Sequence, residues 1–420
     1  MPEELKLRHY GMAFIDVKLL VFLLLLLQAC GSGSSGGGRG QPDETLLRTA
    51  QLITLKPIKE INAEYTQAAS GMVDLLEYYP LESPQGIIIG KIDEMIHYNR
   101  HIYIFDRLAG DIFVYTNKGA FVGNIGKKGK GPDEYADISA FSIDEDGNVC
   151  IWSPYNRKVF VYSVKGELKH SLDIGLLMMD DFYVNADSTI VGYEKRSANE
   201  RLFEGTYPRQ GRIFLLDGKG GLLDHGLTYR YSDALKTYPF SNEFYRFGDS
   251  LSLMEDFGNV VYRIHGRDMN PVPRYVFDFT GANVPLHYEQ AEAVQRKLID
   301  EYQKGGKDEW ASLYRIYETD NYLGFKYGYD RYVYTSFYSK KSGNLINLGF
   351  FWINDRDNIS MPSVSAAGPN DTFYGFIEAH ALIRMVDRNE TGASDRVEQL
   401  RAKLRETDNP VLVSFTLKDF

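Results

Sequence analysis

Cysteine is scarce, because the 420 residues include only Cys30 and Cys150. Two cysteines are too few for the disulfide frameworks of small secreted domains or for cysteine-rich zinc and iron–sulfur sites. Cys150 lies in the apolar stretch GNVCIW, and we interpret it as a small buried side chain on a strand. A catalytic thiol is not indicated there, because the sequence suggests no matching histidine.

An excess of positive charge is also missing. The chain has 47 lysines and arginines against 57 aspartates and glutamates, a formal net charge of −10. Proteins attract nucleic acids and anionic lipid surfaces mainly through basic side chains, so we expect no nucleic-acid partner. Tyrosine (30) and phenylalanine (24) are instead abundant, and aromatic side chains favour the half-buried surface of a β-sheet.

Motifs for phosphate binding and acyl transfer in a suitable context are missing as well. The stretch NIGKKGKGPDEYADIS, residues 124–139, contains glycine–lysine pairs but matches neither the G-x-x-x-x-G-K-[ST] nor the G-x-G-x-x-G pattern. A G-x-S-x-G match occurs at residues 33–37, but it lies within the glycine- and serine-rich stretch and not at a strand-to-helix turn, so a serine-hydrolase elbow is not predicted. The glycines of residues 124–139 therefore need another explanation.

Metal-binding patterns are equally weak. His97 and His101 flank a predicted strand turn and would point apart, which does not suit a shared metal ion. Asp144 begins a stretch that resembles a calcium loop, but Tyr155 stands where the glutamate of that loop should be. We expect a hairpin turn there instead, and the sequence predicts neither a metal nor a cofactor.

One long apolar run is present, and it lies near the N-terminus. Leu19–Leu27 follows Lys18 and is too short for a transmembrane helix, which needs about twenty apolar residues. It predicts a secretory signal peptide over residues 1–29. Leu27-Gln28-Ala29-Cys30 resembles a bacterial lipobox, which implies that Cys30 is lipidated and becomes the mature N-terminus. The alternative, a buried core helix, lacks amphipathic flanking sequence.

Residues 30–50 contain GSGSSGGGRG and predict a flexible tether between the lipid anchor and the folded part. Such an anchor would make the membrane a partner and place the chain in the bacterial cell envelope, where we expect the outer membrane. The tether lacks the acid-rich patch that we associate with surface export in lipoproteins of this kind. We therefore favour the periplasmic face.

A repeat follows the tether. Residues 102–126 align with residues 149–175, and residues 212–227 and 259–279 are a third and a weaker fourth copy. Each copy predicts an apolar strand, a turn, an alternating strand, a lysine–glycine turn and an outer strand. Four short strands repeated every forty to fifty residues or so are typical of a β-propeller blade.

We therefore predict an all-β fold, a six-bladed β-propeller over residues 51–420, because the length suits about six repeats. The final run, NPVLVSFTLKDF, should close the ring against an early strand near Leu75–Tyr79. Between blades four and five, residues from about 285 to 317 have apolar side chains at helical spacing and predict a helical insertion. It would be a lid or partner surface, or alternatively a cover for a blade face. A second helix is predicted over Ser394–Arg405.

Three stretches carry a family resemblance: FVGNIGKKGKGPDEYADISAFSIDEDGNVCIW, the following NRKVFVYS, and the terminal DNPVLVSFTLKDF. They resemble the Bacteroidota-type six-bladed β-propeller lipoproteins, which are distantly NHL-repeat-like, and the resemblance covers most of the chain after Leu75. It implies the propeller fold and an envelope location, in a family whose activity is largely uncharacterised. Its most specific element is a G-x-G-P-x-E-Y turn, matched by Gly129, Gly131, Pro132, Glu134 and Tyr135.

We interpret this turn as the crossing from the outer strand of one blade to the first strand of the next. Tyr135 would pack between blades, and Glu134 would accept hydrogen bonds from backbone N–H groups. The alternative is a basic surface at the channel mouth formed by Lys127, Lys128 and Lys130.

The stretch YLGFKYGYDRYVYTSFYSKK, residues 322–341, is rich in tyrosine. Aromatic rings beside charged groups can stack on a sugar and bind its hydroxyls. The candidate ligand-binding residues are Tyr327, Tyr329, Arg331, Tyr332 and Tyr334. The alternative is packing between blades, because tyrosine suits a sheet.

For function, we predict a protein that binds a glycan, a peptide or a protein partner at the channel mouth. The alternative is an envelope enzyme, a glycan or peptide lyase or hydrolase, with acidic residues in the axial channel. The fold does not choose between them. Two carboxylates, or a histidine and an aspartate, within hydrogen-bond reach in one pocket would favour catalysis. A broad apolar patch on the insertion would indicate a scaffold instead.

Overall fold

The computed structural model describes residues 47–58, 67–84, 86–131, 133–195, 199, 202, 210–228, 243–255, 258–283, 310–330, 332–348, 352–389 and 391–420. The predicted signal peptide, with Cys30, and most of the tether lie outside these residues. Among the described residues, no helix combines the length and the apolar character that crossing a bilayer requires.

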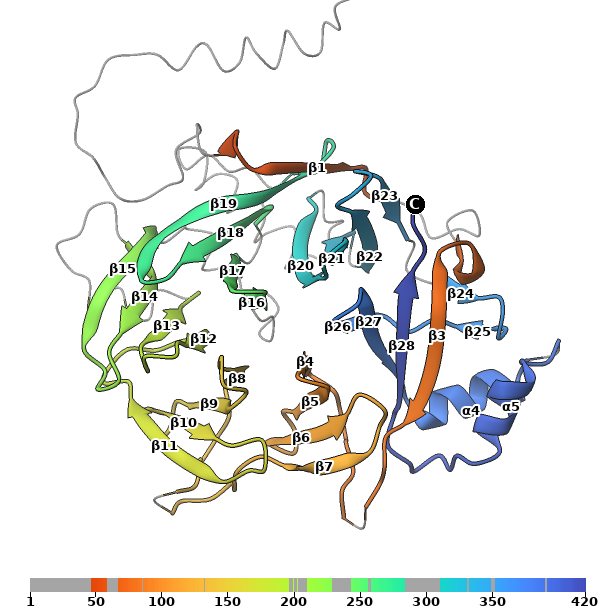
Figure 1. The fold of residues 1–420 in the computed structure, drawn as a ribbon, viewed down its shortest axis with the longest axis horizontal. Coiled ribbons are helices and arrows are strands. Elements are labelled where there is room, and N and C mark those ends of the chain that lie inside the picture. The colour runs from red at the N-terminus through yellow and green to blue at the C-terminus, as the bar shows by residue number, and fades with distance from the viewer. Residues whose placement is uncertain are drawn as a thin grey trace, which may run out of the picture. The chain divides into compact units, whose positions relative to one another are not determined.

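Six antiparallel sheets surround one axis and form a six-bladed β-propeller (Figure 1). Blade 1 contains β4 (Glu94–Tyr98), β5 (His101–Asp106), β6 (Asp111–Thr116) and β7 (Phe121–Asn124). Blade 2 contains β8 (Ala140–Ile143), β9 (Val149–Ser153), β10 (Lys158–Tyr162) and β11 (Leu168–Asp173). Blade 3 contains β12 (Asp181–Val184), β13 (Ile190–Tyr193), β14 (Gln210–Leu216) and β15 (Leu222–Thr228). The sequence repeats thus correspond to blades, as predicted.

Blades 4 to 6 complete the ring. Blade 4 contains β16 (Phe244–Phe247), β17 (Ser250–Met254), β18 (Val260–His265) and β19 (Asp268–Phe279), and β1 (Gln51–Leu55) pairs in parallel with β19. Blade 5 contains β20 (Ser312–Glu318), β21 (Tyr322–Tyr329), β22 (Tyr332–Ser339) and β23 (Leu345–Asn347). Blade 6 contains β26 (Val364–Ala367), β27 (Thr372–Ile377), β28 (Val411–Leu417) and, outermost, β3 (Val73–Pro80). The pairing of β28 with β3 confirms the predicted ring closure.

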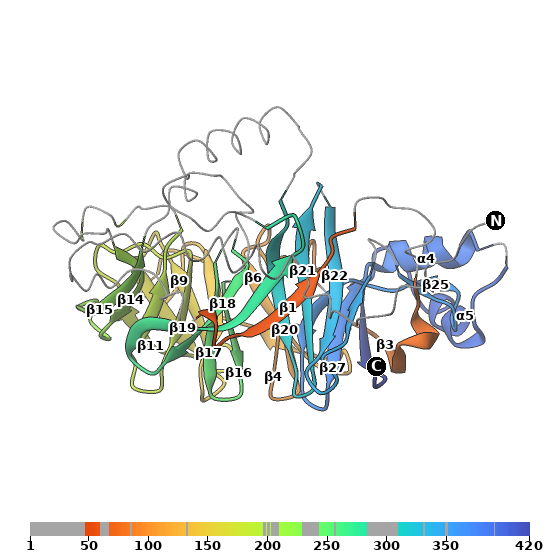
Figure 2. The same cartoon turned by 90° about the horizontal axis from the view of Figure 1, so that it is seen from above.

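The remaining elements lie outside blade 6. A small sheet contains β2 (Gln67–Ala68), β24 (Trp352–Asn354) and β25 (Ile359–Ser360), and the short helix η2 (Ala69–Gly71) follows β2. Helices α4 (Ala379–Asp387) and α5 (Asp395–Arg401) connect β27 to β28. Figure 2 shows the ring from the side, with strands such as β4, β16 and β27 running roughly along its axis.

The lysine–glycine turns explain why the repeat is visible in the sequence. Gly166 and Gly220 both have φ of +81°, which only glycine adopts readily. A Cβ atom on Gly166 would lie 2.6 Å from the main-chain oxygen of Asn124, and one on Gly220 would lie 2.9 Å from that of Asp173. Each turn therefore packs closely against the outer strand of the preceding blade.

Apolar side chains of neighbouring blades form the core. Phe105 of blade 1 contacts Phe141 of blade 2, with ring centroids 6.0 Å apart. Phe277 of blade 4 contacts Phe325 of blade 5 at 4.8 Å. Such aromatic pairs contribute about 0.5–1.5 kcal/mol each beyond the burial of their surface. Cys150 is fully buried on β9, as predicted.

A repeated aspartate fixes the entry of the first strand in blades 1 to 3. Asp93 accepts a hydrogen bond from the backbone nitrogen of Arg107 at 2.9 Å, beyond the end of β5. Asp137 and Asp180 make the same contact in the next two blades, with backbone nitrogens after β9 and β13. Each carboxylate joins the segment before the innermost strand to the segment that follows the second strand.

The predicted helical insertion requires a correction at its end. Residues 284–309 lie outside the described residues, so the helix itself stays a prediction between β19 and β20. Ser312–Glu318, which we included in the helical pattern, is strand β20 and pairs with β21. Leu313 and Tyr317 are four residues apart, which suits a helix, but Tyr314, Ile316 and Tyr317 are residue types that favour strands. The pairing with β21 shows that this segment is a strand and not a helix.

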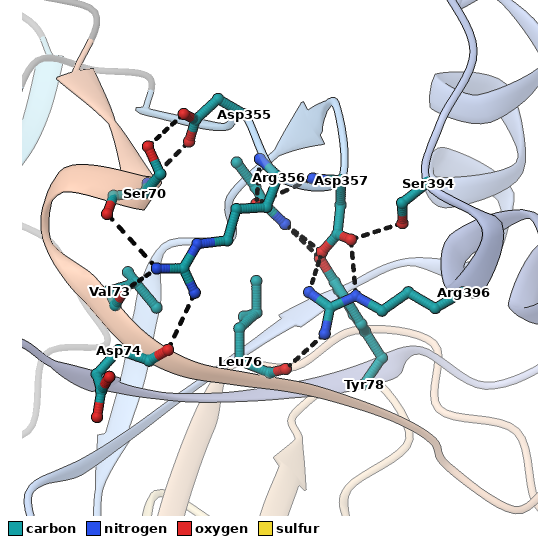
Figure 3. A network of polar contacts seen from close by, with 11 residues as sticks. Ser70, Val73, Asp74, Leu76, Tyr78, Asp355, Arg356, Asp357, Ser394 and Arg396 are labelled. Carbon is teal, nitrogen blue, oxygen red and sulfur yellow. Dashed lines mark hydrogen bonds and ion pairs between the residues drawn. The ribbon is translucent and has the colours of Figure 1, made fainter.

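The predicted helix over Ser394–Arg405 is present but shorter, since α5 ends at Arg401 and Ser394 is its N-cap residue. Helix α4 was not predicted. Beside these helices, Arg356 donates hydrogen bonds to the main-chain oxygens of Val73 at 2.7 Å and Asp74 at 3.0 Å (Figure 3). The loop before β25 is thereby attached to β3, the strand that closes the ring.

Candidate functional site

The axis of the propeller contains a cavity of about 580 Å³. Residues of β4, β8, β12, β16, β20 and β26, the innermost strand of each blade, line it. Consecutive residues of these strands, such as Glu94–Tyr98 of β4 and Arg315–Glu318 of β20, line the cavity. The volume is in the usual range for a small-molecule site, about 300–1,000 Å³.

The turns that join the first and second strands form one mouth of this cavity. A second hollow of about 710 Å³ is lined by these turns in blades 1, 4, 5 and 6, and shares Tyr98 and Arg246 with the axial cavity. In blade 1 the turn residues Asn99 and Arg100 have φ of 45° and 63°, which is the geometry of a tight hairpin. That hairpin holds Tyr98 at the mouth.

Aromatic and charged side chains from blades 1 to 4 meet at this mouth. Arg246 donates a hydrogen bond to the hydroxyl of Tyr183, and its guanidinium lies 5.7 Å from the centroid of that ring. Its second terminal nitrogen lies 3.3 Å from a carboxylate oxygen of Glu145. The hydroxyl of Tyr98 donates to the main-chain oxygen of Glu145 at 2.8 Å. We call Tyr98, Glu145, Tyr183 and Arg246 the rim cluster.

Glu318 lines both the axial cavity and the second hollow, but its carboxylate already has four partners. Its buried carboxylate contacts Arg274 at 2.5 Å and Lys340 at 2.6 Å, and accepts hydrogen bonds from Tyr275 at 2.8 Å and Tyr245 at 3.1 Å. A buried carboxylate needs such partners to remain charged. We interpret this group as structural.

The opposite side of the cavity opens into a side pocket of about 210 Å³ between blades 5, 6 and 1. Glu94, Arg315 and Tyr317 line both spaces. Burial raises the pKa of Glu94 to about 8, although Arg315 opposes the shift. Burial and the neighbouring Arg315 lower the pKa of Lys326, which lines the side pocket, to about 7.

His97 and His101 do not share a site. His97 pairs with Ile102 and His101 pairs with Tyr98 in the β4–β5 hairpin, so the two imidazoles project from opposite faces. The ring of His97 stacks on Tyr374 at 5.1 Å, and burial, with a smaller effect of His101, lowers the pKa of His97 to about 4. Within the described part of the chain, no three histidine, cysteine or acidic side chains are grouped as a metal site.

The tyrosines predicted to bind a ligand lie elsewhere. Tyr327 and Tyr334 are buried between blades, with ring centroids 5.2 Å apart, and Tyr329 is also buried. Tyr332 is 43% exposed, and Arg331 lies outside the described residues. None of the four described tyrosines lines the axial cavity. The burial of Tyr327, Tyr329 and Tyr334 agrees with the packing alternative, and ligand binding by Tyr332 stays a prediction.

The G-x-G-P-x-E-Y turn connects β7 to β8, the crossing from blade 1 to blade 2. Tyr135 is fully buried and donates to the main-chain oxygen of Ile125 at 3.2 Å. Glu134 accepts from the backbone nitrogen of Gly131 at 2.9 Å and pairs with the exposed Lys127 at 2.6 Å. Gly129 leaves the space that the carboxylate of Glu134 occupies. Pro132 lies outside the described residues.

No sequence motif indicated the rim cluster or the side pocket. Tyr98, Tyr183, Arg246 and Arg315 are far apart in the chain, and each stands in an ordinary strand. Tyr98, Tyr183 and Arg246 lie outside the predicted repeat copies, and Arg315 lies within the predicted helical insertion, so no predicted element placed them at the axis.

These features define a six-bladed β-propeller with an axial cavity, and comparisons with known proteins agree with that fold. The model of a domain of unknown function, DUF4934, matches residues 52–416, and the chain belongs to this family. The crystal structure of a presumed exported protein from Bacteroides fragilis aligns with a TM-score of 0.69 at 18% identity, over 88% of this chain and 100% of that one.

Two other solved structures align more weakly. A member of the DUF4221 family from Bacteroides vulgatus has a TM-score of 0.40 at 9% identity, over 82% of this chain and 97% of that one. A virginiamycin B lyase from Staphylococcus aureus has a TM-score of 0.37 at 13% identity, over 72% of this chain and 81% of that one. No curated protein matches the chain.

Proposed function

We propose that this chain is a lipid-anchored protein of the bacterial cell envelope that binds a glycan or peptide in its axial cavity, entered at the rim cluster. The apolar run Leu19–Leu27 and the lipobox-like Cys30 support the anchor. The presumed export of the Bacteroides fragilis protein, which shares the fold, is consistent with this location. The outer membrane, on its periplasmic face, remains the placement that we propose.

The observation that carries the proposal is the composition of the cavity. Six strands, each from another blade, bring aromatic faces and charged groups to one concave surface. Apolar lining with a few convergent polar groups is typical of a ligand site, and ring faces beside charges suit sugars and peptides. The rim cluster places two tyrosine rings, a guanidinium and a carboxylate where a ligand would enter.

A glycan and peptide array tests this function. The full-length chain in detergent micelles should bind a restricted set of glycans or peptides and leave most spots empty. Binding to none of them would contradict the proposal. Binding to all of them alike would contradict it too, because a built cavity discriminates between ligands.

The second candidate is an enzyme of the lyase or hydrolase type. Glu94 favours it, because a carboxyl group with a pKa of about 8 is protonated at neutral pH and can act as a general acid. Asp181 is another acidic residue that lines the cavity, and burial raises its pKa to about 6. However, its carboxylate accepts backbone N–H groups of Phe182, Glu243 and Phe244 at 2.8–2.9 Å, which is an anchoring role.

Turnover of an array ligand separates the two candidates. An enzyme would cleave the bound glycan or peptide, and Glu94→Gln would abolish cleavage while leaving binding intact. A binding protein would release the ligand unchanged. We favour binding because three backbone N–H groups already hold the carboxylate of Asp181, which leaves it in an anchoring role.

A further inference from the structure

We propose that Arg315 and Lys326 form a subsite for one small oxyanion group, a carboxylate or a sulfate, carried by the ligand of the axial cavity. The inference deepens the proposed function and rests on it for the identity of the ligand. The subsite itself is defined by the side pocket between blades 5, 6 and 1.

The two cations are direct neighbours. Arg315 on β20 and Lys326 on β21 are opposite each other in the antiparallel pair, so their side chains leave the same face of blade 5. Like charges in this arrangement destabilise a sheet. The pair also places two hydrogen-bond donors side by side, so that one anion could contact both.

Lys326 has no carboxylate counter-ion in the part of the chain that the structure describes. Among the described residues, no aspartate or glutamate forms an ion pair with its amine, whose nitrogen lies 5.5 Å from the centroid of the Tyr317 ring. Of the two acidic residues in the pocket, Asp93 already contacts Lys91 at 2.6 Å and the backbone nitrogen of Arg107 at 2.9 Å. Glu94 is largely protonated at neutral pH. Among the described residues, the positive charge of Lys326 is therefore not balanced by an ion pair with a carboxylate of the pocket.

The pocket also has space and hydrogen-bond donors for an oxyanion. Its volume is about 210 Å³, and Ser363 and Ser365 of blade 6 line it opposite the two cations. Arg315 can present two parallel N–H groups, the geometry that carboxylate and sulfate prefer. Because Glu94, Arg315 and Tyr317 also line the axial cavity, an anion held here can belong to a ligand whose remaining part lies on the axis.

Anion binding should be coupled to protonation. The groups that face Lys326 are Tyr314, Arg315 and Tyr317 from β20, Asp93 and Glu94 from blade 1, and the two serines from blade 6. With pKa values of about 7 for Lys326 and about 8 for Glu94, raising the pH from 6 to 9 removes protons from both groups. Since a neutral lysine and a charged glutamate both weaken attraction for an anion, affinity should fall over this range.

The test measures binding of sodium sulfate and sodium glucuronate to the full-length chain by calorimetry, with glucose as the neutral control. We expect both anions to bind and glucose not to bind through this pocket. The variant Lys326→Met should lower the affinity for both anions by about ten-fold or more, since it removes a charge-assisted contact. Lys165→Met, an exposed change in the turn of blade 2, should leave them unchanged. Sulfate alone binding would assign a sulfate subsite, and glucuronate alone a carboxylate subsite.

A second measurement does not depend on a variant. In the wild-type chain, NMR of the labelled lysine side chains should show the pKa of Lys326 rising when the anion is added. Equal anion affinity of wild type and Lys326→Met, or an unchanged Lys326 titration, overturns the proposal. Anion binding without any array ligand would contradict the proposed function and leave the subsite standing. Array ligands that bind equally to Lys326→Met would contradict the subsite and leave the function standing.

Discussion

Arg396 in α5 contacts both carboxylate oxygens of Asp357 and donates its third nitrogen to the main-chain oxygen of Leu76 at 3.0 Å (Figure 3). Asp357 also accepts hydrogen bonds from Ser394 at 2.6 Å and from Tyr78 at 2.8 Å. Leu76 and Tyr78 belong to β3, the N-terminal strand that closes blade 6. The two side chains therefore connect the closing strand to a helix from the other end of the chain.

Replacing Asp357 with asparagine should destabilise the ring closure. The carboxylate is almost fully buried, and its loss removes the charge that pairs with the guanidinium of Arg396. Because the Arg396 side chain is 45% exposed, solvent screens part of this pair, and breaking it costs about 1–2 kcal/mol of unfolding free energy. Urea unfolding followed by fluorescence measures it. Asp387→Asn, which removes a surface pair with Arg401, is the matched control and should change stability little. Equal effects of the two changes would contradict this role.

The same carboxylate predicts a pH dependence. Burial opposes its charge, but hydrogen bonds from Arg396, Ser394, Asn354 and Tyr78 hold the pKa of Asp357 at about 2. The folded pKa is below the unfolded value of about 3.9, so the stabilisation is complete above pH 4 and is lost as the pH falls toward 2. The stability difference between wild type and Asp357→Asn should therefore shrink between pH 4 and 2. A difference that stays constant in this window would refute the assignment.

Gly166→Ala should weaken the contact between blades 1 and 2. Its φ of +81° and the main-chain oxygen of Asn124 both oppose a side chain there, and strain of this kind costs about 1–3 kcal/mol. Gly123→Ala is the control, because no heavy atom lies within 4 Å of its added Cβ atom. Thermal unfolding of the two variants should show a lower Tm for Gly166→Ala alone.

Lys326→Met should stabilise the ligand-free chain while removing anion binding. A lysine with a folded pKa of about 7 and an unfolded pKa of about 10.4 destabilises the fold fully below pH 7, and progressively less as the pH rises toward 10. We expect Lys326→Met to gain about 1–3 kcal/mol at pH 7 and less at pH 10. Chemical unfolding at both values measures this. A variant less stable than wild type at pH 7 would show that Lys326 supports the fold.

The fold could be predicted because its determinants are local. The lysine–glycine turns at Gly119, Gly166 and Gly220 recur since each must approach the preceding blade closely, and the repeat follows from them. The final strand could be paired with β3 because an open ring would leave both edges without partners. The boundary near Tyr317 could not be predicted, because its apolar spacing suits a helix and only pairing with β21 selects a strand.

The candidate site could not be predicted from the sequence, because it depends on distances between blades. Tyr327 and Arg246 both stand in strands, but the first lies on the second strand of blade 5 and faces another blade, whereas the second lies on the innermost strand of blade 4. Whether a side chain lines the axial cavity or packs between blades therefore depends on how far its strand lies from the axis. The composition favoured the tyrosine-rich stretch of residues 322–341 as the ligand site, but Tyr327, Tyr329 and Tyr334 of this stretch are buried in the core.

The most direct test of the account is the affinity of the strongest array ligand for Arg246→Ala. This change removes the guanidinium that joins Tyr183 to Glu145 at the cavity mouth. We expect a Kd about ten- to a hundred-fold higher than that of wild type, as for a central binding residue. Arg388→Ala, an exposed arginine after α4, should bind like wild type. If Arg246→Ala also binds like wild type, the ligand does not enter the axial cavity at this mouth, and the central claim is wrong.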